Sequence, residues 1–168
     1  KNGRQQNMLK ETGYHRNDAL LYAKKWALDR NPRYLDFENM GGDCTNFASQ
    51  CIYAGSGVMN YTPVKGWYYN SGRDRTPSWT GVEFLYNFLV GNQSVGPYAV
   101  EAEEDEAEPG DIVQLGDGSG FYHSPVIVHV SRGHIYVAAH TYDVYMRPLD
   151  SYIYEKARFI HIKGVRSW

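Results

Sequence analysis

Cys44 and His123 are residue types that together can cleave amide bonds. Cys44 follows Gly41-Gly42-Asp43 and is expected to begin a helix, where unpaired N–H groups and the helix dipole favour a thiolate. The same N–H groups can bind the oxyanion that forms at an attacked carbonyl. His123 follows a glycine-containing loop and is expected to begin a strand, so its ring can reach a cleft and act as a general base. The pair predicts nucleophilic catalysis through a thioester.

A third group is expected to orient the base. We expect segments 123–130 and 134–141 to form two antiparallel strands in which paired residue numbers add up to 265. His140 then lies diagonal to His123 on the same face of the sheet, with about 7–8 Å between Cα atoms, and can complete a triad. A shift of one residue in this register would break the arrangement. Asp143 is the alternative third member, if the chain bends after the second strand.

The two cysteines are not expected to form a disulfide. Cys44 and Cys51 are seven residues apart on one predicted helix, which separates them by roughly 10 Å along its axis, whereas a disulfide needs Cα atoms closer than about 7 Å. Cys51 is therefore interpreted as a structural core residue. The candidate site also lacks the close ligand spacing typical of zinc sites, so neither a metal nor another cofactor is expected.

The remaining pattern predicts an α+β fold, because helices come first and strands follow. Residues 1–13 are interpreted as a polar leader or linker remnant, and 14–168 as one domain. Thr80 and Glu83 have the spacing of a capping box, and 56–77 is expected to be a loop. The expected helices cover about 17–29, 44–55 and 81–90, and the expected strands cover 112–115, 123–130, 134–141 and 158–165.

Composition narrows the possible partners. The chain has 168 residues and a formal net charge of -2, which suits one globular domain and does not suggest nucleic-acid binding. No apolar run is long enough to cross a bilayer. We expect the chain to be a monomer.

Four blocks of sequence together resemble a known family. They are Gly42-Asp43-Cys44-Thr45-Asn46-Phe47-Ala48-Ser49-Gln50-Cys51, Pro109-Gly110-Asp111-Ile112-Val113-Gln114, His123-Ser124 and Ala139-His140-Thr141. In type and order they are similar to the Putative amidase domain family, which is related to the CHAP and NlpC-type cell-wall hydrolases of papain-like fold. The resemblance extends over about residues 14–165. It implies a helix that bears the cysteine, packed on an antiparallel sheet that supplies the histidine.

The resemblance also implies roles for single residues. Cys44 corresponds to the nucleophile, His123 to the base, and His140 to the position of a third polar group. The type of that group varies among relatives, which keeps Asp143 open.

Three more residues match the motif or its surroundings. Asp43 is expected to cap the helix rather than to take part in the chemistry, and Asn46 is expected to support the helix start. Tyr34 is a candidate extra oxyanion donor, since some relatives use a side chain upstream of the cysteine.

The family implies hydrolysis of amide bonds in bacterial cell-wall peptides, and hence a secreted or cell-wall-associated protein. Three alternatives remain open. One is a structural domain in which Cys44 is simply a buried residue, and the other two differ in function. A Cys-His acyltransferase would use the same residues and pass the acyl group to an amine. A non-catalytic cell-wall or adhesive binding module would use the same fold and the exposed aromatic residues.

Overall fold

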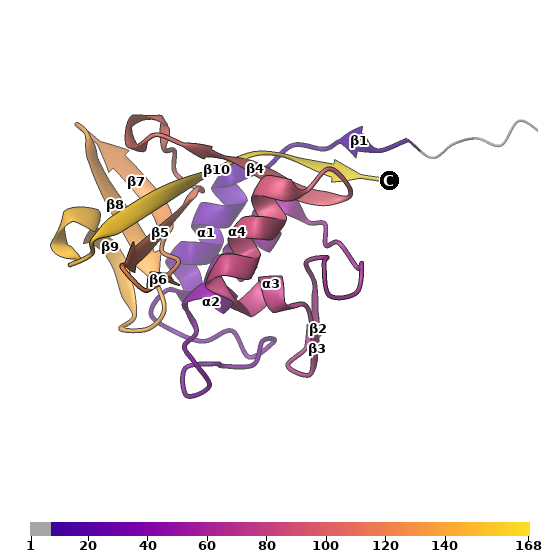
Figure 1. The fold of residues 1–168 in the computed structure, drawn as a ribbon, viewed down its shortest axis with the longest axis horizontal. Coiled ribbons are helices and arrows are strands. Elements are labelled where there is room, and N and C mark those ends of the chain that lie inside the picture. Colours follow the sequence, from indigo (N-terminus) through magenta and orange to yellow (C-terminus); the bar gives the residue numbers. More distant parts are fainter. Residues whose placement is uncertain (1–7) are drawn as a thin grey trace, which may run out of the picture.

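A computed structural model describes residues 8–168, and in it the helices precede most of the sheet (Figure 1). None of the helices in this part of the chain is long and apolar enough to span a bilayer. The helices are α1 (Arg16–Trp26), α2 (Cys44–Ser56), α3 (Pro77–Thr80) and α4 (Val82–Gly91), and the 3-10 turns are η1 (Glu104–Glu106) and η2 (Leu149–Ser151).

One large antiparallel sheet carries most of the strands. Its order is β1-β10-β5-β7-β8-β9, with β4 also pairing with β10 and β6 with β5, while β2 and β3 form a separate hairpin. This confirms the predicted α+β class. The strands are β1 (Lys10–Glu11), β2 (Tyr69–Ser71), β3 (Asp74–Arg75), β4 (Gly96–Ala102), β5 (Ile112–Asp117), β6 (Gly120–His123), β7 (Val126–Ser131), β8 (His134–Ala139), β9 (Val144–Pro148) and β10 (Lys156–Ser167).

Alternation along the strands builds a core on each face of the sheet. Ile112, Val126 and Ile160 belong to the core that contains the helices, while their chain neighbours Val113 and Ile127 belong to a smaller core with Leu149 of η2. Helix α2 is buried along nearly its whole length, between α1, α3 and the strands (Figure 1). A residue at the start of α2 therefore has a position fixed by packing on several sides.

Several elements differ from the expectations. Segments 69–75 and 77–80, predicted as loop or left unassigned, form β2, β3 and α3, and β4 and β9 were not expected. The capping-box prediction is wrong, because Gly81 is the N-cap of α4 and no side chain caps this end. Of the predicted leader, 1–7 lie outside the described residues, and Lys10–Glu11 pair with β10.

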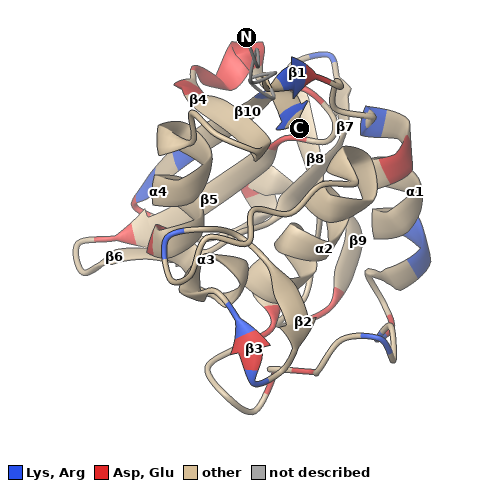
Figure 2. Cartoon of the chain, turned by 90° about the vertical axis from the view of Figure 1, so that its right-hand side faces the viewer, with Lys and Arg blue, Asp and Glu red and all other residues tan. Residues whose placement is uncertain are grey.

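Charged residues of both signs are mixed over the face shown in Figure 2. Basic and acidic residues alternate along α1 and around β3, whereas a run of acidic residues lies next to β4 at the top of this view.

Candidate active site

The chain reaches Cys44 through a sharp turn that glycine permits. Gly41 and Gly42 have φ angles of 101° and 105°, a region that other residues rarely adopt. A Cβ on Gly42 would also lie 3.3 Å from Thr141 Oγ1. This turn lets α2 begin at Cys44, whose side chain is 8% exposed.

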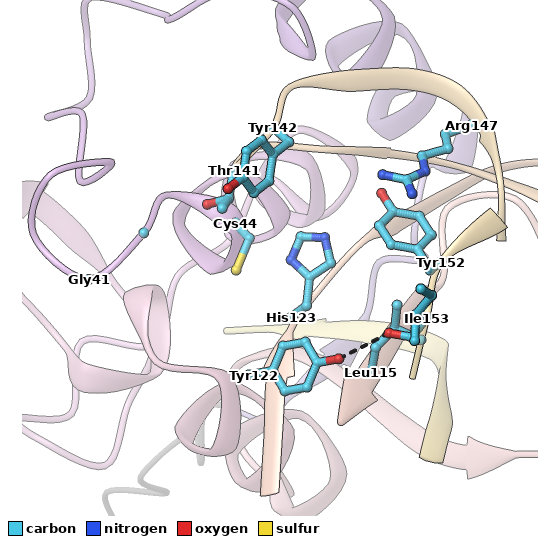
Figure 3. Close-up of a pocket in the computed structure, with 11 residues that line it drawn as sticks. Gly41, Cys44, Leu115, Tyr122, His123, Thr141, Tyr142, Arg147, Tyr152 and Ile153 are labelled. Atoms are coloured by element: carbon cyan, nitrogen blue, oxygen red, sulfur yellow. Dashed lines mark hydrogen bonds between the residues drawn. The ribbon is translucent and has the colours of Figure 1, made fainter. Parts of the chain in front are cut away.

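His123 is the last residue of β6, where it pairs with Leu115 of β5. Its side chain is 8% exposed, and its ring centroid lies 5.7 Å from that of Tyr152. Cys44 and His123 line one cleft of about 310 Å³. In Figure 3 the Cys44 side chain lies next to the His123 ring, with its sulfur directed into the cleft. The structure thus brings together the two residues that the sequence selects as nucleophile and base.

A chain of hydrogen bonds fixes the segment of Cys44 relative to the segment of His123. Thr45 Oγ1, beside Cys44, lies 3.1 Å from Ser124 Oγ, beside His123. Gln114 Nε2 donates to Ser124 Oγ at 3.1 Å, which extends the chain into β5. Sequence reasoning missed Thr45, Ser124 and Gln114 as positioning residues. The available signal was that each lies inside one of the blocks that resemble the family.

The electrostatics of the cleft favour an uncharged resting pair. Burial, together with the positive charge of Arg147, lowers the pKa of His123 from 6.5 to about 4, because both disfavour the imidazolium. Burial also raises the pKa of the Cys44 thiol, against the opposing effect of N–H groups of Ser124 and Thr45 that point at the sulfur. At neutral pH the structure therefore holds a thiol beside a neutral imidazole.

His140 does not join this pair. Its Nδ1 lies 2.5 Å from Asp43 Oδ2 and its Nε2 lies 2.9 Å from the Trp26 carbonyl oxygen. Its ring stacks on Phe47 with 4.1 Å between centroids. Both ring nitrogens are thus engaged away from His123, and the expected contact between the two histidines is not formed.

A shift in strand register explains this correction. Pairs from Ser131↔His134 to His129↔Tyr136 follow the predicted sum of 265, but a bulge at Val128 changes the pairing to Ile127↔Val137. Beyond the bulge the sum is 264, so His140 moves to the opposite parity. His123 also ends β6 instead of beginning the strand that pairs with β8.

The alternative third member, Asp143, is also engaged elsewhere. Its carboxylate accepts two hydrogen bonds from Arg30, at 2.7 and 3.1 Å. No described residue makes a hydrogen bond that shifts the pKa of His123, so the cleft contains Cys44 and a His123 ring that is held by packing.

Asp43 and Asn46 support the helix start in a different way from the one predicted. Asp43 is the N-cap residue of α2, but its carboxylate makes no capping hydrogen bond. It instead accepts hydrogen bonds from the backbone N–H of Phe37 and from Asn46 Nδ2, both at 2.8 Å, in addition to its bond with His140. Asn46 Oδ1 accepts from Trp79 Nε1 at 3.0 Å, so Asn46 has a structural role, as expected.

Tyr34 lies in a separate hollow. It packs against Tyr69 and Trp79, and it lines a pocket that shares no residue with the cleft of Cys44. The structure therefore does not place it as an oxyanion donor.

The rim of the cleft has strained backbone. Thr141 and Tyr142 have φ angles of 61° and 56°, a conformation that costs of order 1–3 kcal/mol for a residue other than glycine. Thr141 Oγ1 accepts a hydrogen bond of 3.4 Å from the N–H of Asp43, and the Tyr142 side chain is 88% exposed. The opposite rim carries Ile153, which is 97% exposed (Figure 3).

A group with metal-ligand chemistry lies outside the cleft. Asp111, Glu108 and His161 bring candidate ligand atoms together. Arg16 already contacts this group, at 2.8 Å from Asp111 Oδ1 and 3.4 Å from Glu108 Oε2. Asp111 also accepts hydrogen bonds from the N–H groups of Ile162 and Glu108. The guanidinium of Arg16 lies where a metal cation would otherwise bind. We therefore interpret the Pro109-Gly110-Asp111 block as a structural connection between α1 and β10.

Comparisons with known proteins identify the family of the chain. The chain is 36% identical over 141 residues to the uncharacterized protein YhbB of Bacillus subtilis (strain 168), and the match covers 80% of this chain. It spans 43% of that protein, so less than half of the relative's length is represented. No solved structure matches the chain. A family model described as "Putative amidase domain" matches residues 13–163. The chain therefore belongs to the Putative amidase domain family, whose description points to hydrolysis of amide bonds.

Proposed function

We propose that the chain is a cysteine-dependent amide hydrolase with a papain-like arrangement, in which Cys44 is the nucleophile and His123 the base. The observation that carries the proposal is the shared cleft, which both side chains line from different elements, α2 and β6. Membership of the amidase family supports amide hydrolysis as the reaction.

The reaction would proceed through a thioester. His123 takes the proton from Cys44 as the sulfur attacks the carbonyl carbon of the amide. The carbon–nitrogen bond then breaks, and the imidazolium returns its proton to the leaving amine. His123 next takes a proton from water, the resulting hydroxide attacks the thioester carbon, and the carbon–sulfur bond breaks. Free acid and thiol are regenerated, and no redox partner is needed.

Backbone groups are the best candidates for stabilising the oxyanion. The first N–H groups of a helix have no partner within the helix, and Cys44 occupies that position in α2. N–H donors fixed in place before the reaction stabilise developing negative charge without reorganisation. Tyr34 is not needed for this role.

The proposed substrates are amides of bacterial cell-wall peptides, and the proposed location is secreted or cell-wall-associated. The support is the similarity of the sequence blocks to the CHAP and NlpC-type cell-wall hydrolases. An open cleft whose rims carry Tyr142 and Ile153 suits an extended peptide.

The test uses the two cysteines of α2 as a matched pair. Purified peptidoglycan fragments are incubated with the wild type, Cys44→Ala, His123→Ala and Cys51→Ala, and new amino termini are followed by mass spectrometry. We expect Cys44→Ala and His123→Ala to lose at least about a thousandfold in rate. Cys51→Ala, which changes a core residue of the same helix, should remain close to the wild type.

Two results would refute the proposal. One is amide hydrolysis that persists in Cys44→Ala, and the other is an equal loss in Cys51→Ala. Adding a primary amine to the reaction separates hydrolysis from acyl transfer, because an acyltransferase would form the substituted amide as its main product.

A further inference from the structure

The wall of the cleft carries a positive charge and no negative charge. Its lining residues are Gly41, Gly42, Cys44, Leu115, Tyr122, His123, Thr141, Tyr142, Arg147, Tyr152 and Ile153. Arg147 is the permanently charged member of this set, and the lining contains no carboxylate. A bound ligand therefore meets an uncompensated positive charge near the reactive pair.

Arg147 is held in place by neutral groups. Its guanidinium lies over the ring of Tyr152, with 3.6 Å from Cζ to the ring centroid. Its Nε donates to Ser151 Oγ at 2.8 Å and its Nη2 to the Ser151 carbonyl oxygen at 3.2 Å. Within residues 8–168, no carboxylate forms an ion pair with this guanidinium. The guanidinium is thus fixed before binding, and its positive charge has no acidic partner in the cleft.

The position of Arg147 matters to the base. Tyr152 packs against both the guanidinium and the His123 ring, and Figure 3 shows Arg147 and Tyr152 on one side of that ring, with Cys44 on the other. Tyr122, next to His123 in the chain, directs its hydroxyl to the Ile153 carbonyl oxygen at 3.4 Å. The base therefore faces a cation and a phenol where an enzyme with a Cys-His-acid triad would have a polar orienter.

We propose that Arg147 binds a carboxylate of the substrate beside the scissile amide, so that the preferred substrates are acidic peptides. The inference rests on the proposed function, since it names the substrate class of the same site. Arg forms paired, charge-assisted hydrogen bonds with carboxylates. The anion also neutralises the charge that disfavours the imidazolium formed during the reaction. The substrate then supplies the negative charge that the cleft lacks.

The first test needs no substrate. Alkylation of Cys44 by iodoacetate, an anion, is compared with alkylation by neutral iodoacetamide in a Cys51→Ala background, and the ratio of rates is normalised to free cysteine. We expect a normalised ratio of about ten or more in the wild type, because charge-assisted hydrogen bonds typically give tenfold to hundredfold effects. The ratio should fall to about one in Arg147→Gln and stay partly raised in Arg147→Lys, which keeps the charge. Arg132→Gln, which removes an exposed arginine outside the cleft, is the matched control.

The second test compares peptide amides that differ only in a glutamate or glutamine next to the cleaved bond. The wild type should favour the acid by about tenfold to hundredfold in kcat/KM, and Arg147→Gln should lose this preference. Hydrolysis that is indifferent to the carboxylate, with an iodoacetate ratio near one in the wild type, overturns the inference and leaves the hydrolase intact. A raised ratio with no hydrolysis of any amide would refute the proposed function alone. Failure of both reagents to label Cys44 overturns both proposals.

Discussion

Protonation of His123 should make the stability of the protein depend on pH in a defined window. Burial and Arg147 lower its pKa from 6.5 to about 4 in the folded state, whereas the unfolded chain keeps the ordinary value near 6.5. Between these two values the unfolded state binds more protons, so the free energy of unfolding rises with pH there. The free energy of unfolding therefore reaches its full value above about pH 6.5, where His123 is neutral in both states. It falls as the pH decreases towards 4, because the unfolded chain takes up the proton first. At about 1.36 kcal/mol per pH unit, the whole effect is about 3 kcal/mol.

Urea unfolding of the wild type and of His123→Gln at pH 7 and at pH 4.5 measures this effect. The linkage relation gives a loss of about 2 kcal/mol for the wild type between these pH values. His123→Gln cannot titrate at this position, so it should lack this part of the loss. Carboxylates such as Asp36 and Asp117, whose pKa values are lowered in the folded protein, contribute equally to both proteins and cancel in the comparison. Parallel losses in the two proteins would refute the assignment of His123 as a buried, neutral base.

Three substitutions test the residues that hold the site together. His140→Ala leaves the buried Asp43 carboxylate without its histidine partner, and breaking a buried pair costs about 3–5 kcal/mol. The control His134→Ala, at an exposed position, should change the free energy of unfolding by less than about 0.5 kcal/mol. Equal urea midpoints for the two variants would contradict this structural role of His140. Ser124→Ala removes the hydroxyl that connects α2 to β5. It should lower the free energy of unfolding by about 1–3 kcal/mol and lower kcat more than it raises KM. Unchanged stability and kcat would show that this hydrogen-bonded connection does not position the site. Asp111→Asn should destabilise the fold by about 3 kcal/mol, because it removes the buried carboxylate that pairs with the partly exposed guanidinium of Arg16. Thermal unfolding in the presence and absence of zinc should give the same midpoint for the wild type, and a clear rise with zinc would instead indicate a metal site.

The site was predictable where one local feature determines it. A glycine pair before a cysteine, followed by an apolar helix, is enough to place Cys44 at a helix start, and α2 begins at this residue. His123 was found because a glycine loop precedes it and an apolar strand segment follows. Both signals lie within a few residues in the sequence, so they do not depend on the rest of the fold.

The prediction of His140 as a third triad member was wrong because it depended on distant pairing. The choice of His140 depended on a register carried over seven pairs, from Ser131 and His134 to Pro125 and His140, and the register changes at the bulge at Val128. A bulge leaves no mark in an alternating apolar pattern, since Val126 and Val128 still face the helices. The missed strand β9, which carries Arg147, has a similar cause: Val144–Pro148 is half-exposed and lacks the apolar alternation that marks a buried strand.

The weakness of His123 as a base is what gives Arg147 its importance. A base whose pKa is about 4 accepts a proton from a thiol with little driving force, and catalysis is most effective when that pKa approaches the working pH. An anion on Arg147 would remove one of the two causes of the shift. The acid limb of kcat/KM, which reports the free enzyme, should therefore lie near pH 4, while the acid limb of kcat, which reports the enzyme–substrate complex, should lie at higher pH with an acidic peptide. In Arg147→Gln the acid limb of kcat/KM itself should rise, because the cation is gone, and the difference between acidic and neutral peptides should disappear. Equal acid limbs for kcat and kcat/KM in the wild type would show that substrate binding leaves the base unchanged, and the role of Arg147 in tuning it would be rejected.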